Sequence, residues 1–431
     1  MNNVFAWRLS RLIYFVRRVK GSIAQRGWHG AFKRLVQQRQ GLRSMLWPRA
    51  EASALPVPAI TDREGARRLL VIESMVPDPV RDSGSMRLSH MLGLLHEDGW
   101  RIDFIAADGF ATPDDVVRLA DLGVHYQPQN PLDWLRREGG KLDAVMLSRL
   151  PVAAQYLDVV RQQAPRATIV FDTVDLHFVR EQRAAALTGN ARLLRHAVQS
   201  RKHEIDAISR SDVTLVVSPE EQATLARELP GARVELVSNI HEVYGRKQGF
   251  KARKDLLFVG GFGHPPNADA VRWFADEILP LLRAQEPALV LHVAGDIDDA
   301  SRRSLTREGL RIHGRVGDIA PLMEQCRVSV APLRFGAGVK GKVNLAMSYG
   351  LPVVVTSIAA EGMHLEDRVN AMIGDGAEAF AQAVLQVYRD EGLWSRLSDA
   401  SLQNVHDHFS VEQARASLRR VFSVIDPTPR A

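Results

Sequence analysis

The stretch 328-VSVAPLRFGAGVKGKVNLAMSYGLPVVVTS-357 holds the local pattern that decides the fold. An apolar run over 328–333 is followed by a glycine-rich turn, a helical segment over 338–349 and a β-branched run over 352–357. Short buried strands that alternate with helices form parallel sheets, because a parallel pair needs a long crossover connection. The stretch therefore predicts one strand–helix–strand unit of an α/β protein.

The same alternation extends along the chain and divides into two halves. Strands are expected at 67–75, 101–107, 142–149, 167–175, 213–218 and 234–239, and again at 255–261, 289–296, 310–314, 328–333, 352–357 and near 370–373. Helices are expected between them, including one long charged helix over roughly 179–210. The pattern predicts two doubly wound, Rossmann-like domains, residues 67–240 and 254–410, and a helix within 411–431 that crosses back to the first domain. Because ligands bind at the carboxyl ends of strands in such sheets, a cleft is expected between the domains.

The excess positive charge of the chain is confined to its N-terminus. The 431 residues carry a net charge of +6, but residues 1–50 hold 11 Lys and Arg and no Asp or Glu, against 45 Lys and Arg and 50 Asp and Glu in the rest. Apolar residues recur there every three or four positions, on one face of a helix (Phe5, Leu9, Leu12, Val16, Val19 and Ile23). An apolar stripe with basic flanks favours a helix that lies on an anionic membrane surface.

A helix packed on the protein's own body or on a partner would show the same stripe. Nucleic acid is disfavoured as a partner, because the body is acidic and no nucleic-acid-binding motif follows. Residues 51–66 are interpreted as a linker. No apolar run approaches the roughly 18 residues of a membrane span, and no signal-peptide pattern is visible. The single cysteine, Cys326, excludes an internal disulfide, and we expect it to be buried as a small hydrophobe in a reducing compartment.

Two glycine-rich turns in the second half are candidate phosphate sites. Each follows a strand and precedes a helix, whose N-terminal N–H groups attract anions. The candidate residues are Arg334, Gly336, Gly338, Lys340 and Lys342 in the first turn, and Gly261, Gly263, His264 and Asn267 in the second. The alternative is an ordinary strand–helix turn with solvated lysines and a loop-packing histidine.

Polar residues also gather at two strand ends of the first half. The loop 77–87 contributes Asp82, Ser83, Gly84, Ser85 and Arg87, and the loop 171–181 contributes Asp172, Asp175, His177, Arg180 and Glu181. Such groups orient sugar hydroxyls or act in acid–base chemistry, and Asp172, Asp175 and His177 are candidate catalytic residues. Glu361, after the strand 352–357 of the second half, is the fourth candidate. A capped turn or a structural capping network is the alternative, and the spacing does not favour a metal.

Residues 255–424 resemble the C-terminal domain of the group 1 (family 4) glycosyltransferases, which have the GT-B fold. The matching stretches are LLFVGGFGHPPNADAV, LVLHVAGD, IHGRVGDIAPLMEQCRVSVAPLRFGAGVKGKVNLAMSYGLPVVVTS and EGM. The first half is similar to bacterial surface-polysaccharide transferases in VPDPVRDSGSMR and VFDTVDLHFVREQR. The resemblance implies transfer of a sugar from a nucleotide diphosphate, with retention at the anomeric carbon and with no metal or other cofactor. The resemblance implies that the donor binds the second domain, where Arg334, Lys340 and Lys342 would neutralise the diphosphate. It implies that the acceptor binds the first domain, near 77–87 and 172–181.

The sequence departs from the family at one position that matters. The family has a Glu-x7-Glu pattern whose second glutamate binds the ribose of the donor, and Ala337 and Leu345 occupy these two slots here. Asn344 and Glu361 are the candidate replacements. The resemblance implies a hexosyl- or deoxyhexosyltransferase that acts on a lipid-linked glycan of O-antigen or capsule assembly at the cytoplasmic face of the inner membrane. The alternatives are an inactive scaffold protein of the same fold and a nucleotide-sugar epimerase.

Overall fold

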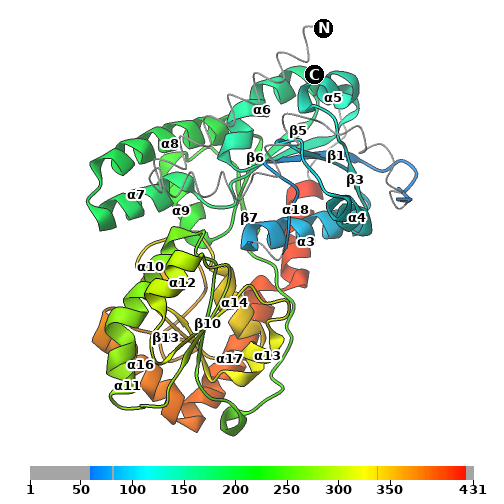
Figure 1. The fold of residues 1–431 in the computed structure, drawn as a ribbon. Helices are drawn as coiled ribbons and strands as arrows, with labels where there is room; N and C mark the ends of the chain where they lie inside the picture. Colours follow the sequence, from blue (N-terminus) through cyan, green and yellow to red (C-terminus); the bar gives the residue numbers. More distant parts are fainter. Residues whose placement is uncertain (1–58, 80–81, 337, 424–431) are drawn as a thin grey trace. The chain divides into compact units, whose positions relative to one another are not determined.

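The computed structural model describes residues 59–79, 82–336 and 338–423 (Figure 1). The basic arm predicted over 1–50 lies outside these residues. The chain divides into two compact units. Of the described residues, unit 1 contains those up to Leu215, Glu228–Val234 and those from Val421 onwards, and unit 2 contains those in Val216–Arg227 and Glu235–Arg420.

Unit 1 is built on a seven-stranded sheet in the order β3-β2-β1-β4-β5-β6-β7. Its strands are β1 (Arg68–Glu73), β2 (Arg101–Ala106), β3 (Val124–Tyr126), β4 (Ala144–Ser148), β5 (Thr168–Asp172), β6 (Val213–Val216) and β7 (Val234–Leu236). The pairs from β3 through to β6 are parallel. The strand order reverses between β1 and β4, which are neighbours although two strands separate them in the chain. This topological switch point is where open α/β sheets bind ligands.

The helices of unit 1 connect these parallel strands. They are α3 (Ser83–Glu97), α4 (Pro113–Asp121), α5 (Pro131–Glu138), the 3-10 turn η2 (Gly139–Lys141), α6 (Leu150–Gln163), α7 (His177–Thr188) and α8 (Ala191–Ser209). The middle residues of the central strands are apolar, because both faces of the sheet are covered. In β1, for example, Leu69, Leu70, Val71 and Ile72 are completely buried.

The prediction of one continuous helix over 179–210 is wrong. The segment forms two helices, α7 and α8, that pack against one another. Gly189 adopts a left-handed conformation with φ 62° and ends α7. The Asn190 side chain then accepts hydrogen bonds from the N–H groups of Arg192 and Leu193 and begins α8. A left-handed glycine followed by an N-cap asparagine is a strong helix stop and start.

Unit 2 repeats the architecture with a six-stranded parallel sheet in the order β10-β9-β8-β11-β12-β13. Its strands are β8 (Leu256–Val259), β9 (Leu291–Ala294), β10 (Leu310–Gly314), β11 (Val328–Ala331), β12 (Val353–Val355) and β13 (Met372–Ile373). Here the order reverses between β8 and β11. The loops that follow these two strands are the two glycine-rich turns of the sequence analysis, so the topology brings them to one edge of the sheet.

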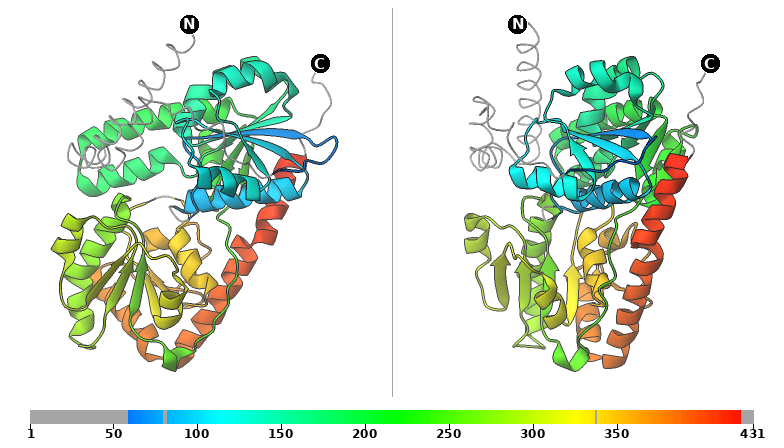
Figure 2. Two further views of the ribbon diagram at one scale, coloured as in Figure 1. Left: turned by 45° about the vertical axis from the view of Figure 1, so that its right-hand side comes forward. Right: turned by 90° about the vertical axis from the view of Figure 1, so that its right-hand side faces the viewer.

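Helices pack on both faces of the unit 2 sheet (Figure 2). The helical segments that lie wholly or mainly in unit 2 are α9 (Pro219–Glu228), η3 (Phe250–Ala252), α10 (Pro265–Trp273), the π-helical turn η4 (Phe274–Ile278), α11 (Leu279–Arg283), α12 (Asp299–Leu305), α13 (Ala320–Gln325), α14 (Gly341–Ser348), α15 (Ser357–Ala360), α16 (Ala377–Arg389), α17 (Glu391–Phe409) and α18 (Val411–Ser423). Cys326 is fully buried in this core, as expected, and burial raises the pKa of its thiol to about 12.

The end of α18 belongs to unit 1. Phe422 packs edge-on against Trp100, with ring centroids 5.4 Å apart, and both side chains are buried. The carbonyl of Phe422 accepts a hydrogen bond from Arg67 Nη1 at 3.3 Å. The last described residues of the chain thus complete the packing of its first folded segment.

Candidate functional site

Asn267 connects the two glycine-rich turns of unit 2. It lies in the first turn of α10 and is 6% exposed. Its Nδ2 donates to the carbonyl of Gly261 at 2.9 Å, and its Oδ1 accepts a hydrogen bond from Lys342 Nζ. A Cβ on Gly260 would lie 2.7 Å from Asn267 Nδ2, so a side chain at Gly260 would displace this amide. The carboxyl ends of β8 and β11 are therefore joined by one buried side chain.

Lys342 lies in an environment that disfavours its charge. Burial, assisted by the nearby charge of Lys340, lowers the pKa of Lys342 to about 7. Its Nζ lies 4.9 Å from the ring centre of Phe258. Lys340, 7% exposed, reaches the carbonyl of Glu361 with its Nζ at 3.4 Å. The ammonium groups of Lys340 and Lys342 repel each other when both are charged, and an anionic ligand bound beside them would reduce this repulsion.

Arg334 is tied to the same helix as Asn267. Its Nε and Nη2 bond the two carboxylate oxygens of Asp269 at 2.9 and 2.5 Å. Its guanidinium also lies 5.7 Å from the ring centre of Trp273. The turn that follows needs glycine, because Gly336 and Gly338 have φ of 153° and 67°. Arg334, Lys340 and Lys342 thus belong to the turn and the first residues of one helix, α14, and cations at a helix start can attract an anion.

The two candidate replacements for the family's carboxylates differ in accessibility. Asn344 is completely buried, and neither Nδ2 nor Oδ1 has a hydrogen-bond partner. In this conformation it does not reach solvent, so a contact between Asn344 and a ligand would require a rearrangement. Glu361 is half-buried beside Lys340. Leu345 packs half-buried against the core of unit 2, and His264 is exposed at the N-cap position of α10, next to Gly263.

In unit 1, the structure gives several predicted site residues an internal partner. Arg87 and Asp172 are buried to 1% and 0% exposure, and Arg87 Nη1 bonds both carboxylate oxygens at 2.8 and 2.9 Å. We therefore reassign this pair from substrate contact to the structural core. Asp82 is the N-cap of α3 and accepts a hydrogen bond from the N–H of Ser85 at 2.8 Å. Ser83 and Gly84 are the first two residues of α3.

The groups that do reach the surface of unit 1 belong to the start of α7. Asp175 forms an ion pair with Arg180, its Oδ1 lies 3.4 Å from His177 Nε2, and all three side chains are 15–25% exposed. Burial and the charge of Arg180 lower the pKa of His177 to about 4, so this imidazole is neutral at pH 7. Burial would raise the pKa of Asp175, but Arg180 outweighs it and holds that pKa low. A carboxylate and a neutral imidazole side by side can accept hydrogen bonds from hydroxyl groups.

Two further acidic side chains support this helix. Glu181 is buried and bonds His196 Nδ1 at 2.9 Å. Glu204, on α8, accepts from the N–H groups of His177 and Phe178 at 3.2 and 3.1 Å and caps α7. Burial raises the pKa of Glu204 to about 8. Glu181 thus holds α8 against α7 and does not present its carboxylate to solvent.

Sequence reasoning missed two charged residues at the switch point of unit 1. Glu73 is the last residue of β1, and Arg149 follows the last residue of β4. They form an ion pair, with Arg149 Nε 3.1 Å from Glu73 Oε2. Their position in the sequence could have indicated them, because each directly ends a run of uncharged residues in a strand of a parallel sheet.

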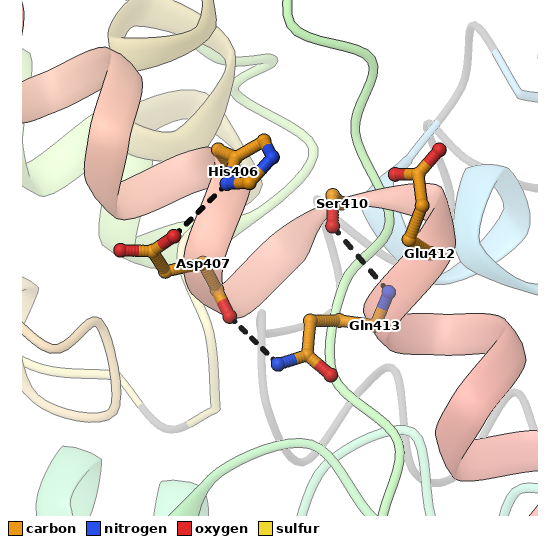
Figure 3. A pocket seen from close by; sticks show the side chains of 5 residues that line it. All are labelled: His406, Asp407, Ser410, Glu412 and Gln413. Atoms are coloured by element: carbon orange, nitrogen blue, oxygen red, sulfur yellow. Dashed lines mark hydrogen bonds and ion pairs between the residues drawn. The ribbon is translucent and has the colours of Figure 1, made fainter.

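A hollow of about 420 Å³ lies at the junction of α17 and α18 (Figure 3). Its lining residues are His406, Asp407, Ser410, Glu412 and Gln413. Figure 3 shows that they bond mainly to one another, with His406 on Asp407 and with Gln413 on Ser410 and on the carbonyl of Asp407. None of the predicted site residues takes part in it.

Comparisons with known proteins relate part of the chain to the glycosyltransferases. Residues 253–390 match the family described as "Glycosyl transferases group 1". A protein of Klebsiella pneumoniae described as an uncharacterized 44.6 kDa protein in the cps region is 24% identical over 180 residues, 40% of this chain and 45% of that protein. The match therefore spans less than half the length of this curated relative.

Solved structures extend the likeness to both units. Sucrose-phosphate synthase from Thermosynechococcus elongatus gives a TM-score of 0.63 at 15% identity, covering 83% of this chain and 98% of that one. HepE of Anabaena in complex with UDP-glucose gives 0.61 at 13% identity, covering 83% and 99%. Together with the two parallel sheets, these likenesses confirm the predicted α/β GT-B fold. In the part of the chain that is described, no helix is both long enough and apolar enough to cross a bilayer.

Proposed function

We propose that the chain is a retaining glycosyltransferase that moves a sugar from a nucleotide diphosphate to a lipid-linked oligosaccharide in cell-surface polysaccharide assembly. The observation that carries this proposal is the linked cluster at the switch point of unit 2. Lys342 bonds Asn267 of α10, and Arg334 bonds Asp269 of the same helix. Lys340 reaches the carbonyl of Glu361, and all of these residues lie inside the segment that matches the glycosyltransferase family. A cationic helix start is suited to a departing nucleotide diphosphate.

The nature of the donor and of the acceptor is supported by the relatives. HepE binds UDP and UDP-glucose, which favours a UDP-sugar as the first donor to test. The cps-region protein of Klebsiella pneumoniae favours a glycan of the cell surface. The basic, apolar-striped arm over 1–50 would hold the enzyme at the anionic cytoplasmic face of the inner membrane, where a lipid-linked acceptor lies.

The decisive experiment is a nucleotide-sugar panel with synthetic lipid-linked acceptors, read by mass spectrometry. The double variant Lys340→Ala, Lys342→Ala should lose turnover of any donor that the wild type uses. The matched control is Lys251→Ala, Lys254→Ala, which removes two exposed lysines elsewhere in unit 2. Equal rates for the wild type and the Lys340/Lys342 variant would refute the phosphate assignment. Deleting residues 1–50 should move the protein from membrane to soluble fractions, and an unchanged distribution would refute the membrane role of the arm.

A second candidate function is a donor-binding protein without turnover. It is favoured by the apolar Leu345 in the slot of the family's ribose-binding glutamate and by the complete burial of Asn344 beside it. The same panel distinguishes the two functions. Donor binding measured by calorimetry, with no transfer and no donor hydrolysis across the panel, would favour the binding protein.

A further inference from the structure

We propose that Arg149 binds the acceptor, donating hydrogen bonds from its guanidinium group to hydroxyl groups of a neutral sugar, and that Glu73 positions Arg149 for this contact. The proposal rests on the proposed function, because it takes unit 1 as the acceptor-binding unit. It is carried by the place, the backbone conformation and the charge surroundings of Arg149.

Arg149 and Glu73 stand at the switch point of the unit 1 sheet. Strands β1 and β4 pair in parallel with Ile72 opposite Leu147, so their carboxyl ends lie at the same level. Glu73 and Arg149 lie at this edge. From β1 the sheet continues to β2 and β3 on one side, and from β4 it continues to β5, β6 and β7 on the other. Crevices that bind small molecules in open α/β sheets form at such places.

The backbone at this point is held in conformations that L-residues avoid. Arg149 has φ 73° and ψ 146°, a region that is populated almost entirely by glycine. Val174, a β-branched residue, has φ 65°. Both approach Gly84, where an added Cβ would lie 2.8 Å from Val174 Cγ1 and 3.1 Å from Arg149 Nη2. The segments around Gly84, Arg149 and Val174 thus pack closely against one another. Glycine would adopt the backbone conformation of position 149 with less strain than arginine does.

The side chain of Arg149 is anchored at one end and accessible at the other. Glu73, 4% exposed, accepts hydrogen bonds from Ser148 Oγ at 2.9 Å and from Arg149 Nε at 3.1 Å. The Arg149 side chain is itself 28% exposed, and its Nη2 lies 3.6 Å from Asp82 Oδ1. Burial opposes its charge, but Glu73, Asp82 and Asp175 outweigh burial and raise the pKa of Arg149. The guanidinium is therefore a permanent, fixed donor.

The charge balance indicates what Arg149 binds. The carboxylates of Glu73, Asp82 and Asp175 surround it, and Arg180 is the second cation of the group. Three negative and two positive charges make a poor site for a phosphate. They suit neutral hydroxyl groups, which accept hydrogen bonds from Arg149 and donate to Asp82. The ligand class is therefore an uncharged, polyhydroxylated sugar of the acceptor.

The test compares Arg149→Lys and Arg149→Gly with a matched control, Arg368→Gly. Arg368 also has a positive φ, 63°, but is exposed in unit 2. With lipid-linked mono- and disaccharides as acceptors, both Arg149 variants should raise the acceptor KM at least about tenfold, because hydrogen bonds from a charged donor are lost. The donor KM should stay unchanged, and the control should change neither constant. Glu73→Gln should raise the acceptor KM less than the Arg149 variants do.

A binding measurement keeps the inference testable without turnover. Saturation-transfer NMR with free mono- and disaccharides should show contacts in the wild type that are lost in Arg149→Gly and kept in Arg368→Gly. If Arg149→Gly does not fold, Arg149→Lys carries the comparison. Sugar binding without any transfer would refute the proposed function while supporting Arg149. A wild-type acceptor KM and wild-type NMR contacts in the Arg149 variants, competition by inorganic phosphate, or no sugar binding in the wild type would overturn the inference.

Discussion

Replacing Lys342 with methionine should stabilise the free protein and weaken donor binding at the same time. Lys342 carries a charge that its surroundings disfavour, and methionine keeps the length of the side chain without the ammonium group. The free protein would lose a destabilising charge, whereas the complex would lose the cation that faces the diphosphate.

The size of the effect follows from the lowered pKa. An unfolded lysine titrates near 10.5, and Lys342 in the folded protein titrates near 7. At about 1.4 kcal/mol per pKa unit, the cost at pH 7 has an upper limit of about 4 kcal/mol. The side chain is only half-buried, so solvent screening reduces this cost to about 2 kcal/mol. The lost hydrogen bond to Asn267 costs about 1 kcal/mol, which leaves a net gain of about 1 kcal/mol for Lys342→Met.

The sign of the pH dependence is fixed by the same shift. Above pH 10.5 Lys342 is neutral in both the folded and the unfolded chain, and it costs nothing. As the pH falls from 10.5 to 7, only the unfolded chain takes up the proton, so the free energy of unfolding decreases; below pH 7 the cost is constant. Lys342→Met should remove this slope, which urea unfolding at pH 7 and pH 9.5 measures. Lys251→Met, at an exposed lysine, is the control.

Donor binding should also take up a proton. A diphosphate beside Lys342 would raise its pKa again, so at pH 7 about half a proton is taken up per UDP bound, approaching one near pH 8 and none near pH 5.5. Calorimetry with UDP in buffers of different ionisation enthalpy measures this number. The same proton uptake in Lys342→Met as in the wild type would refute the reasoning, and so would a Lys342→Met variant that is less stable at pH 7.

Three further predictions concern single buried groups. Gly260→Ala should weaken UDP binding several-fold in calorimetry, because the new Cβ would lie 2.7 Å from the Asn267 amide; unchanged affinity would contradict the role of this amide. Asp172→Asn should lower the free energy of unfolding by about 3–5 kcal/mol, because it leaves the buried charge of Arg87 without a counter-charge; a loss below 1 kcal/mol in urea titrations would argue against that pairing. Glu204→Gln should be stabilising at pH 9 relative to pH 5, because an acid with a pKa raised to about 8 costs stability progressively as the pH rises from 4.5 to 8 and in full above it; parallel melting profiles of variant and wild type would exclude this raised pKa.

The positions of the strands other than β3 were predictable because each is a short apolar run between turn residues. This pattern does not depend on distant contacts. The segment between 108 and 141 was left without elements, although it forms α4, β3 and α5. Its helix start was readable, since Thr112 and Asp115 form a reciprocal capping box. The polar composition of α4 concealed it, because only one narrow face of this helix is buried.

The positions of the candidate site residues were likewise predictable from the sequence only in part. Glycine and lysine at a strand–helix turn are local signals, so the presence of a lysine-bearing turn at the edge of the unit 2 sheet was predictable from residues such as Gly338 and Lys342. Asn344 was proposed as a donor contact because it neighbours Leu345, but which face of α14 is buried depends on packing against α17. Arg149 and Glu73 come together only when β1 and β4 become neighbours, which is a property of the topology and not of any local stretch.

The contact between Phe422 and Trp100 has a consequence for the order in which the protein can fold during synthesis. Chains emerge from the ribosome N-terminus first, and domains fold as units as they appear. The packing of Phe422 on Trp100 and the hydrogen bond from Arg67 to the carbonyl of Phe422 can form only when residues 421–423 have been made, after all of unit 2. A nascent unit 1 therefore lacks this cover over Trp100 until the end of α18 has been synthesised. A truncation that removes α18 would leave that surface open permanently, even though every strand of both sheets had been synthesised.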